Sequence, residues 1–380
     1  MRPSPRPPRR LLRALTAAVG IAALAAAGCV AYAEQSDPSD VDMKPAAEFQ
    51  LGVTHGNTPL PHGDPAATER ATEILQNVAP LQNQHIMGFG ADNPWPNQNS
   101  DERDFVSLDA RVEYIESTGA APVVTLCCAP GWMKEGGDDW DFNAPLKPDH
   151  YDEYAQLSAQ VAERYPQVEH FQVWNEFKGF WNGDRLDHVA FTKFYNEVYT
   201  AVKEVRPDAK IGGPYISLGL YYGADGPPVG SDLKGEWGEA DGRDVEAIRY
   251  WIDNNVGADF FTLDAWTLDG DGNALDVDQM RQMFSDVTKW VTEESGLPVW
   301  WSEFYAPLSG EEPGDNVDPT TPEAVTAALE GMRDGGAAAA LWWSPECTES
   351  PHPCYFTSTE GADGGQRNEF TDVAESFSAS

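Results

Sequence analysis

The chain alternates short apolar runs with longer stretches in which apolar residues recur every three or four positions. The eight short runs cover residues 49–54, 86–90, 122–127, 170–174, 209–213, 260–265, 298–302 and 337–343. The longer stretches are clearest at residues 66–78, 150–165, 189–205, 245–255, 277–295 and 322–334. Short apolar runs are typical of buried strands, and the wider spacing is typical of helices. Their alternation predicts a parallel sheet covered by helices.

Eight strand units in one chain of 380 residues predict that the sheet closes on itself. We therefore expect an α/β fold of the (β/α)8 TIM-barrel type, as a single domain over residues 46–380. The alternative is an open doubly wound sheet, whose dinucleotide-binding members carry a Gly-x-Gly-x-x-Gly turn after a strand. No such turn follows any of the eight runs, which favours the barrel.

Long polar segments follow five of the predicted strands. They cover residues 92–104, 129–147, 214–243, 266–276 and 305–320. In a barrel of this type all of them lie at the carboxyl ends of the strands, where active sites form. We expect the functional site there.

Two of the apolar runs lead into a glutamate. The fourth run, HFQVW, is followed by Asn175 and Glu176, and the seventh run, PVWWS, is followed by Glu303. Nearly opposite positions on a barrel rim can aim two carboxylates at one point, which is the arrangement used to cleave a glycosidic bond. Each glutamate alone could be an ordinary rim carboxylate, but two at matched positions favour catalysis.

The sequence Trp174-Asn175-Glu176 on the fourth strand, with Glu303 ending the seventh, resembles the clan of retaining (β/α)8 glycosidases. Within it the chain is most similar to the family 39 β-xylosidases, with family 5 next. Further similarity lies in residues 129–132, 164–166 and 203–211, and the resemblance spans roughly residues 49–343. It implies that Glu176 is the acid/base, that Glu303 is the nucleophile, and that Asn175 binds the sugar 2-hydroxyl.

The chain departs from the family pattern at three places. Phe177 follows the acid/base where proline is usual, and the second predicted strand lacks the expected arginine. The sixth strand ends in Asp264-Ala265-Trp266 where His-x-Tyr is common. These departures weaken the transfer of xylose specificity.

Other rim residues are candidates for binding the sugar. Trp132, Trp266 and Trp342 could stack on a sugar ring, and Trp342 is favoured over its neighbour Trp343. His55 follows the first predicted strand and Asp92 follows the second, so either could bind a hydroxyl group. For each of these residues a purely structural role is the alternative.

The N-terminal segment predicts export. Five arginines precede an apolar run at residues 15–27, which is too short to span a membrane. Residues 1–33 are therefore predicted to be a signal peptide, and residues 34–45 a polar tether. Residues 26–29 form a lipobox-like site at which Cys29 would be lipidated and would anchor the protein to the outer face of a bacterial membrane, whereas Ala31-Tyr32-Ala33 would allow soluble secretion.

The net charge and the cysteine content limit the kinds of partner, cofactor and disulfide that we expect for this protein. A formal net charge of −37 disfavours nucleic acid and anionic lipid surfaces. Residues 269–273 do not continue as an EF-hand, and we expect neither a metal nor another cofactor. Cys347 and Cys354 could staple a short loop, which leaves Cys127 and Cys128 as two thiols or as a bonded pair of neighbours.

Taken together, these features predict an exported retaining β-glycoside hydrolase that degrades a polysaccharide or oligosaccharide by double displacement. A β-xyloside or xylan is the favoured substrate, and a β-galactofuranose chain or another cell-envelope glycan is the alternative. A different class of function is a non-catalytic carbohydrate-binding lipoprotein. The retention of both glutamates with Asn175 argues against a pure binder.

Overall fold

The computed structural model describes residues 49–182, 185–219, 229–265, 267, 274–306, 320–347 and 353–378. Within these ranges no helix is long and apolar enough to cross a membrane. The predicted signal peptide and tether lie outside the described residues, as do Cys29 and Trp266, so the expectations placed on them remain predictions.

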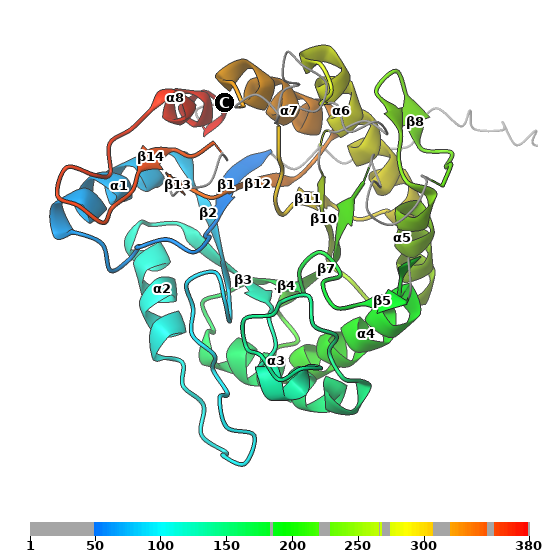
Figure 1. The fold of residues 1–380 in the computed structure, drawn as a ribbon. Helices are drawn as coiled ribbons and strands as arrows, with labels where there is room; N and C mark the ends of the chain where they lie inside the picture. The colour runs from blue at the N-terminus through cyan, green and yellow to red at the C-terminus, as the bar shows by residue number, and fades with distance from the viewer. Residues whose placement is uncertain are drawn as a thin grey trace, which may run out of the picture. The chain divides into compact units, whose positions relative to one another are not determined.

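Eight parallel strands close into a barrel in the order β1-β12-β11-β10-β7-β4-β3-β2 (Figure 1). Their bounds are β1 Gln50–Thr54, β2 Leu81–His85, β3 Ala121–Leu126, β4 His170–Val173, β7 Lys210–Leu218, β10 Phe260–Ala265, β11 Val299–Trp301 and β12 Ala339–Trp343. The predicted α/β TIM barrel is confirmed. Several strands are buried on both faces, β10 along its whole length, which explains why they read as continuous apolar runs.

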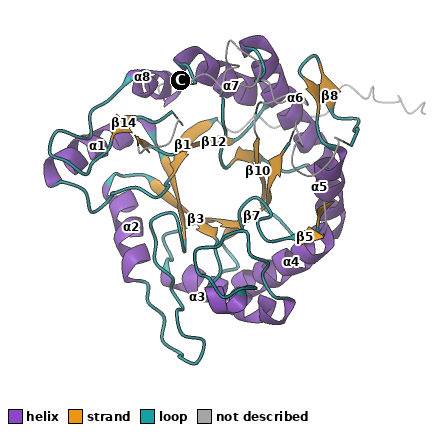
Figure 2. Ribbon diagram, in the orientation of Figure 1, coloured by secondary structure: helices purple, strands orange, loops and turns teal. Residues whose placement is uncertain are grey.

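Helices surround the barrel (Figure 2). They are α1 Pro65–Val78, α2 Val106–Ser117, α3 Tyr151–Arg164, α4 His188–Val205, α5 Gly242–Asn254, α6 Val277–Ser295, α7 Pro322–Gly335 and α8 Glu369–Ser378. Local chemistry sets several ends: α6 begins with a capping box between Asp276 and Gln279 and ends at Gly296 in the left-handed conformation. Each buries its apolar stripe against the strands.

Minor elements decorate the loops. These are the 3-10 helices η1 Gly131–Met133 and η2 Pro148–His150, and the short strands β5 Trp181–Asn182, β6 Arg185–Leu186, β8 Lys234–Gly235, β9 Gly238–Glu239, β13 Glu346–Cys347 and β14 Phe356–Thr357. Both disulfides are formed, Cys347–Cys354 as expected and Cys127–Cys128 as a bonded pair of neighbours rather than two thiols.

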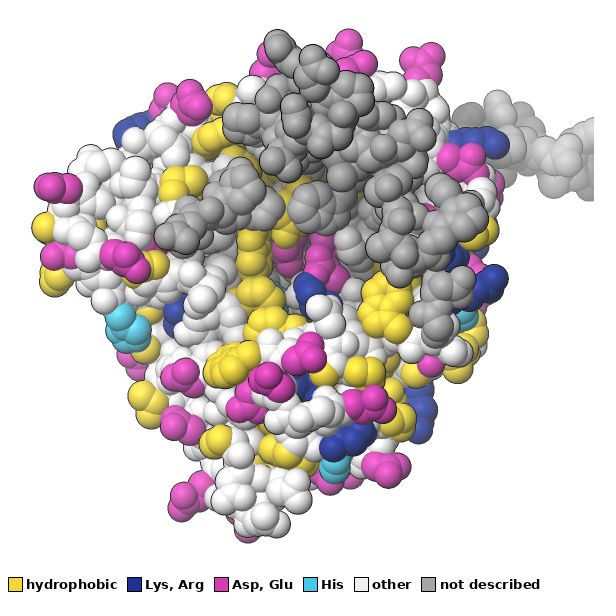
Figure 3. Space-filling model, in the orientation of Figure 1, with side chains coloured by type: hydrophobic (Ala, Val, Ile, Leu, Met, Phe, Trp, Pro, Cys, Tyr) yellow, Lys and Arg dark blue, Asp and Glu magenta, His cyan; other side chains and the backbone are white. Residues whose placement is uncertain are grey.

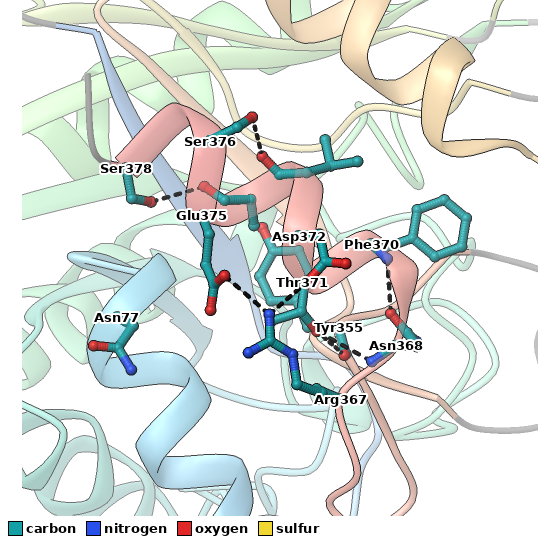
Figure 4. Close-up of polar contacts among 12 residues, drawn as sticks. Asn77, Tyr355, Arg367, Asn368, Phe370, Thr371, Asp372, Glu375, Ser376 and Ser378 are labelled. Atoms are coloured by element: carbon teal, nitrogen blue, oxygen red, sulfur yellow. Dashed lines mark hydrogen bonds and ion pairs between the residues drawn. The ribbon is translucent and has the colours of Figure 1, made fainter.

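Polar contacts hold the segment after β14 in place, most of them between residues of that segment (Figure 4). Arg367 pairs with Asp372 and Glu375 of α8, at 2.6 and 2.9 Å. Asn368 donates to the carbonyl oxygen of Cys354, and the hydroxyl of Ser378 reaches the carbonyl oxygen of Val78 at the end of α1. Helix α8 thereby covers the first strand next to α1 and α7.

The second strand lies five residues earlier than predicted. Its sequence LQNQH carries four polar residues, yet all five positions are buried. Gln82 donates to Thr118 at the end of α2, outside the barrel, whereas Asn83 donates to Thr54 and accepts from Thr125 of the neighbouring strands. A buried strand with four polar residues has no apolar signature, so the prediction of residues 86–90 was wrong.

Candidate active site

Glu303 lies two residues beyond β11 at the carboxyl end of the barrel, and only 3% of its surface is exposed. Its Oε1 accepts hydrogen bonds from the hydroxyl of Tyr215 at 2.5 Å and from Nδ2 of Asn175 at 3.2 Å. Its Oε2 accepts from the hydroxyl of Tyr305 at 2.6 Å. Three donors therefore fix the orientation of the carboxylate.

Tyr215 reaches Glu303 because of a bulge in β7. The pairing of β7 with β10 shifts between Thr262 and Leu263, so Tyr215 has no partner of its own in the ladder. Tyr215 also has a positive φ of 53°. A bulge re-aims a side chain, and here it turns the phenol towards Glu303. Pro214 in the middle of a strand was the sequence signal for this irregularity.

Glu176 follows β4 and faces Glu303 across the end of the barrel. Carboxylate oxygens of Glu176, Asp264 and Glu303 lie within 4.8 Å of one another. Retaining glycosidases hold their two carboxyl groups about 5 Å apart, whereas inverting enzymes need a wider gap of roughly 6.5–9.5 Å for a water. The structure thus brings the predicted pair of glutamates together.

The backbone that presents Glu176 is unusual. Trp174, Glu176 and Phe177 have positive φ angles of 66°, 50° and 54°. Non-glycine residues rarely adopt this conformation, and it concentrates at functional sites where the surroundings hold it. Phe177, which replaces the family's proline, stacks on Phe191 at 3.8 Å and so anchors the segment in the apolar layer.

Lys178 places a positive charge among the three carboxylates. Its ammonium forms an ion pair with Glu176 and donates to Oδ1 of Asn175 at 3.0 Å. Burial lowers the pKa of Lys178, while the negative charges of Glu303 and Asp264 oppose that shift. The sequence analysis did not identify Lys178 as a candidate site residue.

Asp264 is a third carboxyl group at the site. It lies near the end of β10 and is fully buried. Neither of its oxygens makes a hydrogen bond of normal geometry among the described residues, although the Ser217 hydroxyl is near enough to oppose the rise in its pKa. Burial raises the pKa of Asp264 well above its ordinary value, and the charge of Glu303 adds to the effect. A protonated Asp264 can donate to a ligand. In the sequence analysis, Asp264 was named only as part of the departure from the family's His-x-Tyr pattern.

His85 ends β2, where Asp92 had been expected to lie. Both ring nitrogens are buried without a partner among the described residues. Burial, together with the charge of Lys178, lowers the pKa of His85 to about 3, so the imidazole is neutral at physiological pH. Its ring packs 4.3 Å from Phe89 and 6.4 Å from Trp343. A neutral imidazole can both donate to and accept from a sugar hydroxyl.

Two of the predicted sugar-binding residues are corrected. Asp92 is exposed in the loop after β2, and its backbone N–H is bonded to Ser107 of α2. Trp342 is 1% exposed, because its indole packs on Tyr355 at 4.8 Å and donates to the carbonyl oxygen of Pro353. Adjacent strand residues face opposite sides, so Trp343 rather than Trp342 turns towards the site.

The other predicted sugar-binding residues that the structure describes, His55 and Trp132, lie at the carboxyl end of the barrel. His55 is buried after β1 and its Nε2 is bonded to Gln82 at 2.9 Å, and burial lowers its pKa to about 4. Trp132 is half-buried in the loop after β3 and donates to the carbonyl oxygen of Trp95. His55 therefore has a structural partner that limits its role in binding a ligand.

The centre of this face carries the charged groups. Figure 3 shows acidic and basic side chains at the floor of a hollow, with hydrophobic side chains beside it. The three carboxylates could also surround a divalent cation, but the ammonium of Lys178 already pairs with Glu176. The arrangement favours acid–base and nucleophilic chemistry by carboxyl groups.

Comparisons with known proteins agree with this geometry. A family model described as "Glycosyl hydrolases family 39" matches residues 97–332. No curated protein matches the sequence.

Solved structures share the fold at low sequence identity. A monomeric beta-xylosidase from Caulobacter crescentus is 16% identical, with a TM-score of 0.58, over 88% of this chain and 68% of that one. A glucosidase from Croceicoccus marinus is 17% identical, with a TM-score of 0.56, over 88% and 68% of the two chains. An endo-beta-1,4-mannanase from Thermotoga petrophila is 14% identical, with a TM-score of 0.55, over 87% and 77%.

Proposed function

The chain belongs to family 39 of the glycosyl hydrolases, and from this premise we propose that it is an exported, retaining β-glycosidase with a β-xyloside or xylan as substrate. That it is a glycoside hydrolase acting on a carbohydrate follows from the family itself. The observation that carries the finer proposal is the facing pair of Glu176 and Glu303 with oxygens within 4.8 Å.

The proposed reaction is a double displacement. Glu303 attacks the anomeric carbon while Glu176 gives its proton to the departing glycosidic oxygen, and a covalent glycosyl ester forms on Glu303. Glu176, now ionised, takes a proton from water, and that water displaces Glu303 from the anomeric carbon. The product keeps its β configuration, and both glutamates return to their starting states.

The surrounding groups support each half of this cycle. Tyr215 and Tyr305 hold Glu303 in place for attack and solvate its charge when the ester breaks. Lys178 stabilises the ionised Glu176 that the second half requires. Asn175 lies between Glu303 and Lys178, where its side chain can also reach the sugar 2-hydroxyl.

Two unpartnered groups give the sugar its polar contacts in this proposal. His85 on β2 and Asp264 on β10 are buried with hydrogen-bonding atoms that lack partners among the described residues. Buried polar atoms without partners cost free energy, which a bound ligand with hydroxyl groups would recover. Both therefore are expected to contact hydroxyls of the sugar that Glu303 attacks.

Xylose is favoured by the family 39 match and by the shared fold of a β-xylosidase from Caulobacter crescentus. A glucosidase and a mannanase share the fold equally well, and Asp264 changes the polar contacts of the pocket. A cell-envelope glycan such as a β-galactofuranose chain stays the alternative, particularly if a lipidated Cys29 holds the enzyme at the membrane.

The test is hydrolysis of aryl glycosides by the protein without residues 1–33. The panel contains β-xyloside, β-glucoside, β-galactofuranoside, β-mannoside and α-L-arabinofuranoside. We expect turnover of one β-glycoside, a β-configured first product by proton NMR, and a loss of at least about a thousandfold in Glu303→Gln.

Full activity of Glu303→Gln would overturn the nucleophile assignment, and an α-configured first product would overturn retention. Binding of polysaccharide without any turnover would favour the non-catalytic alternative. Export is tested separately, by expressing the full chain and its Cys29→Ser variant and fractionating the cells: anchorage through Cys29 predicts membrane association that the variant loses.

A further inference from the structure

Among the described residues, the two most exposed tryptophans lie on the same end of the barrel. Trp140 is 55% exposed and Trp181 is 41% exposed. They belong to the loops that follow β3 and β4, next to the strand that presents Glu176. Exposing a large aromatic surface to water is unfavourable, and where it occurs near an active site it commonly marks a place where a ligand binds.

The loop that presents Trp140 is held in shape by a buried lysine. Lys134 is 1% exposed, and its ammonium donates to the carbonyl oxygens of Asp139 and Asp141, at 2.9 and 2.8 Å. Asp139 in turn accepts from the backbone N–H of Gly131 at 2.6 Å. Because burying an ammonium is costly unless it is well bonded, the loop closes around it. The indole of Trp140 is thereby fixed before any ligand arrives.

A series of ring contacts links Trp140 to the active site. Trp140 meets Phe142 edge-on with centroids 6.5 Å apart, and Phe142 stacks on Phe89 at 5.2 Å. Phe89 meets Trp343 at 5.2 Å, and Trp343 contacts His85 at the end of β2. The side chains of Phe89, Phe142 and Trp343 are all half-buried, so each keeps some surface open to a ligand.

The turn that presents Phe89, like the loop that carries Trp140, has a well-defined conformation. Gly88, Phe89 and Gly90 all have positive φ, at 71°, 49° and 86°. A Cβ atom on Gly88 would lie 2.5 Å from the ring of Phe142, so only glycine allows the two segments to approach this closely. The non-glycine Phe89 in a left-handed conformation is a costly feature that the surroundings maintain.

We propose that Trp343, Phe89, Phe142 and Trp140 form an aromatic strip that binds a neutral β-linked polysaccharide chain as it leaves the catalytic centre. Sugar rings expose C–H faces that stack on aromatic rings, and a strip continuous with the site suits a chain of linked sugars. The proposal rests on the proposed function and deepens it: the enzyme acts on polymers in preference to short glycosides.

The negative charge of the loop that carries Trp140 favours a neutral polymer over an acidic one. Glu135, Asp138 and Asp141 are exposed carboxylates on the same loop as Trp140. They repel a chain that carries a carboxylate on every sugar, since like charges disfavour association. A neutral glycan has no such cost, so the strip discriminates against polyuronates.

The experiment compares xylohexaose with 4-nitrophenyl β-xyloside as substrates for wild type, Trp140→Ala and Trp140→Phe. We expect the ratio of kcat/KM for xylohexaose to that for the aryl glycoside to fall about tenfold in Trp140→Ala. Trp140→Phe keeps an aromatic ring and should restore part of the ratio. Val106→Ala, at an apolar residue that is 75% exposed at the start of α2, is the matched control and should leave the ratio unchanged.

An unchanged ratio in Trp140→Ala would overturn the strip. If the wild type hydrolyses neither substrate, the proposed xylosidase function fails, and the strip is then tested by retardation in gels that contain xylan, β-glucan, mannan or polygalacturonate. Retardation by a neutral glycan that weakens in Trp140→Ala supports the strip. Equal retardation of the two proteins in every gel, or retardation by polygalacturonate alone, overturns it.

Discussion

At the scale of single residues, the site is organised around a carboxylate with three donors. Tyr215, Asn175 and Tyr305 come from three different segments, and all donate to Glu303. Hydrogen bonds to an ionised group are stronger than those between neutral groups. The orientation of Glu303 therefore depends on two side chains far from it in the sequence, Tyr215 and Asn175, and on the nearby Tyr305.

Removing one donor tests this dependence. Tyr215→Phe deletes the hydroxyl that donates to Oε1 and should lower kcat/KM on the preferred aryl glycoside about ten- to a hundredfold. Tyr195→Phe is the matched control, because the Tyr195 hydroxyl donates to the carbonyl oxygen of Gly257 and makes no contact with Glu303. Equal effects of the two variants would contradict a specific role for Tyr215.

Lys178 forms an ion pair with Glu176, the proposed acid/base residue. Lys178→Met removes the charge that holds the Glu176 carboxylate and should lower kcat/KM on the preferred aryl glycoside about tenfold. Lys178→Arg keeps the positive charge and should retain more activity than Lys178→Met. Equal activity of Lys178→Met and wild type would show that the ion pair is not needed for catalysis.

At the scale of helices and strands, buried polar groups affect structure and stability in ways that the apolar pattern does not predict. Strand β2 buries two glutamines and an asparagine, and helix α5 buries Asp244 in its first turn. One Asp244 oxygen accepts from the backbone N–H of Gly219 at 2.8 Å, and the other has no partner among the described residues. Burial raises the pKa of Asp244 to about 8, and nearby Asp241 adds to the shift.

This raised pKa gives a pH dependence of stability with a defined sign. Between pH 4 and 8 the folded protein keeps a proton on Asp244 that the unfolded chain has lost. The stabilisation is therefore fully present below the unfolded pKa and is lost as pH rises through this window. Asp244→Asn removes the titration, so the Tm of wild type relative to this variant should fall from pH 4 to pH 8. Asp253→Asn, exposed on the same helix, should follow wild type.

At the scale of the whole molecule, net charge is the dominant electrostatic feature. A formal charge of −37 creates repulsion within the compact state, and added salt screens it. The Tm at pH 7 should therefore rise as NaCl increases from about 0.02 M to about 0.3 M. Near the sequence pI of 4.3 the net charge approaches zero and the rise should disappear. A Tm that is independent of salt at pH 7 would contradict this account.

The sequence by itself predicted the barrel and placed Glu176 and Glu303 at the same end of it. Seven of the eight predicted runs overlap barrel strands, because parallel strands covered on both faces are usually apolar. Glu176 and Glu303 were found because each directly follows such a strand, and topology then brings the ends of β4 and β11 to the same face. Local pattern and a general rule about barrels were sufficient.

Only the tertiary structure decided which other residues surround the pair. His85 was missed because β2 has no apolar signature, and Tyr215 because a bulge turns it inward. Trp342 and Trp343 are adjacent residues of the same type, so the sequence does not tell them apart. Only the orientation of β12 shows that Trp342 packs in the core and that Trp343 faces the site. Side-chain direction and burial depend on contacts between distant segments, and these contacts are not encoded in local periodicity.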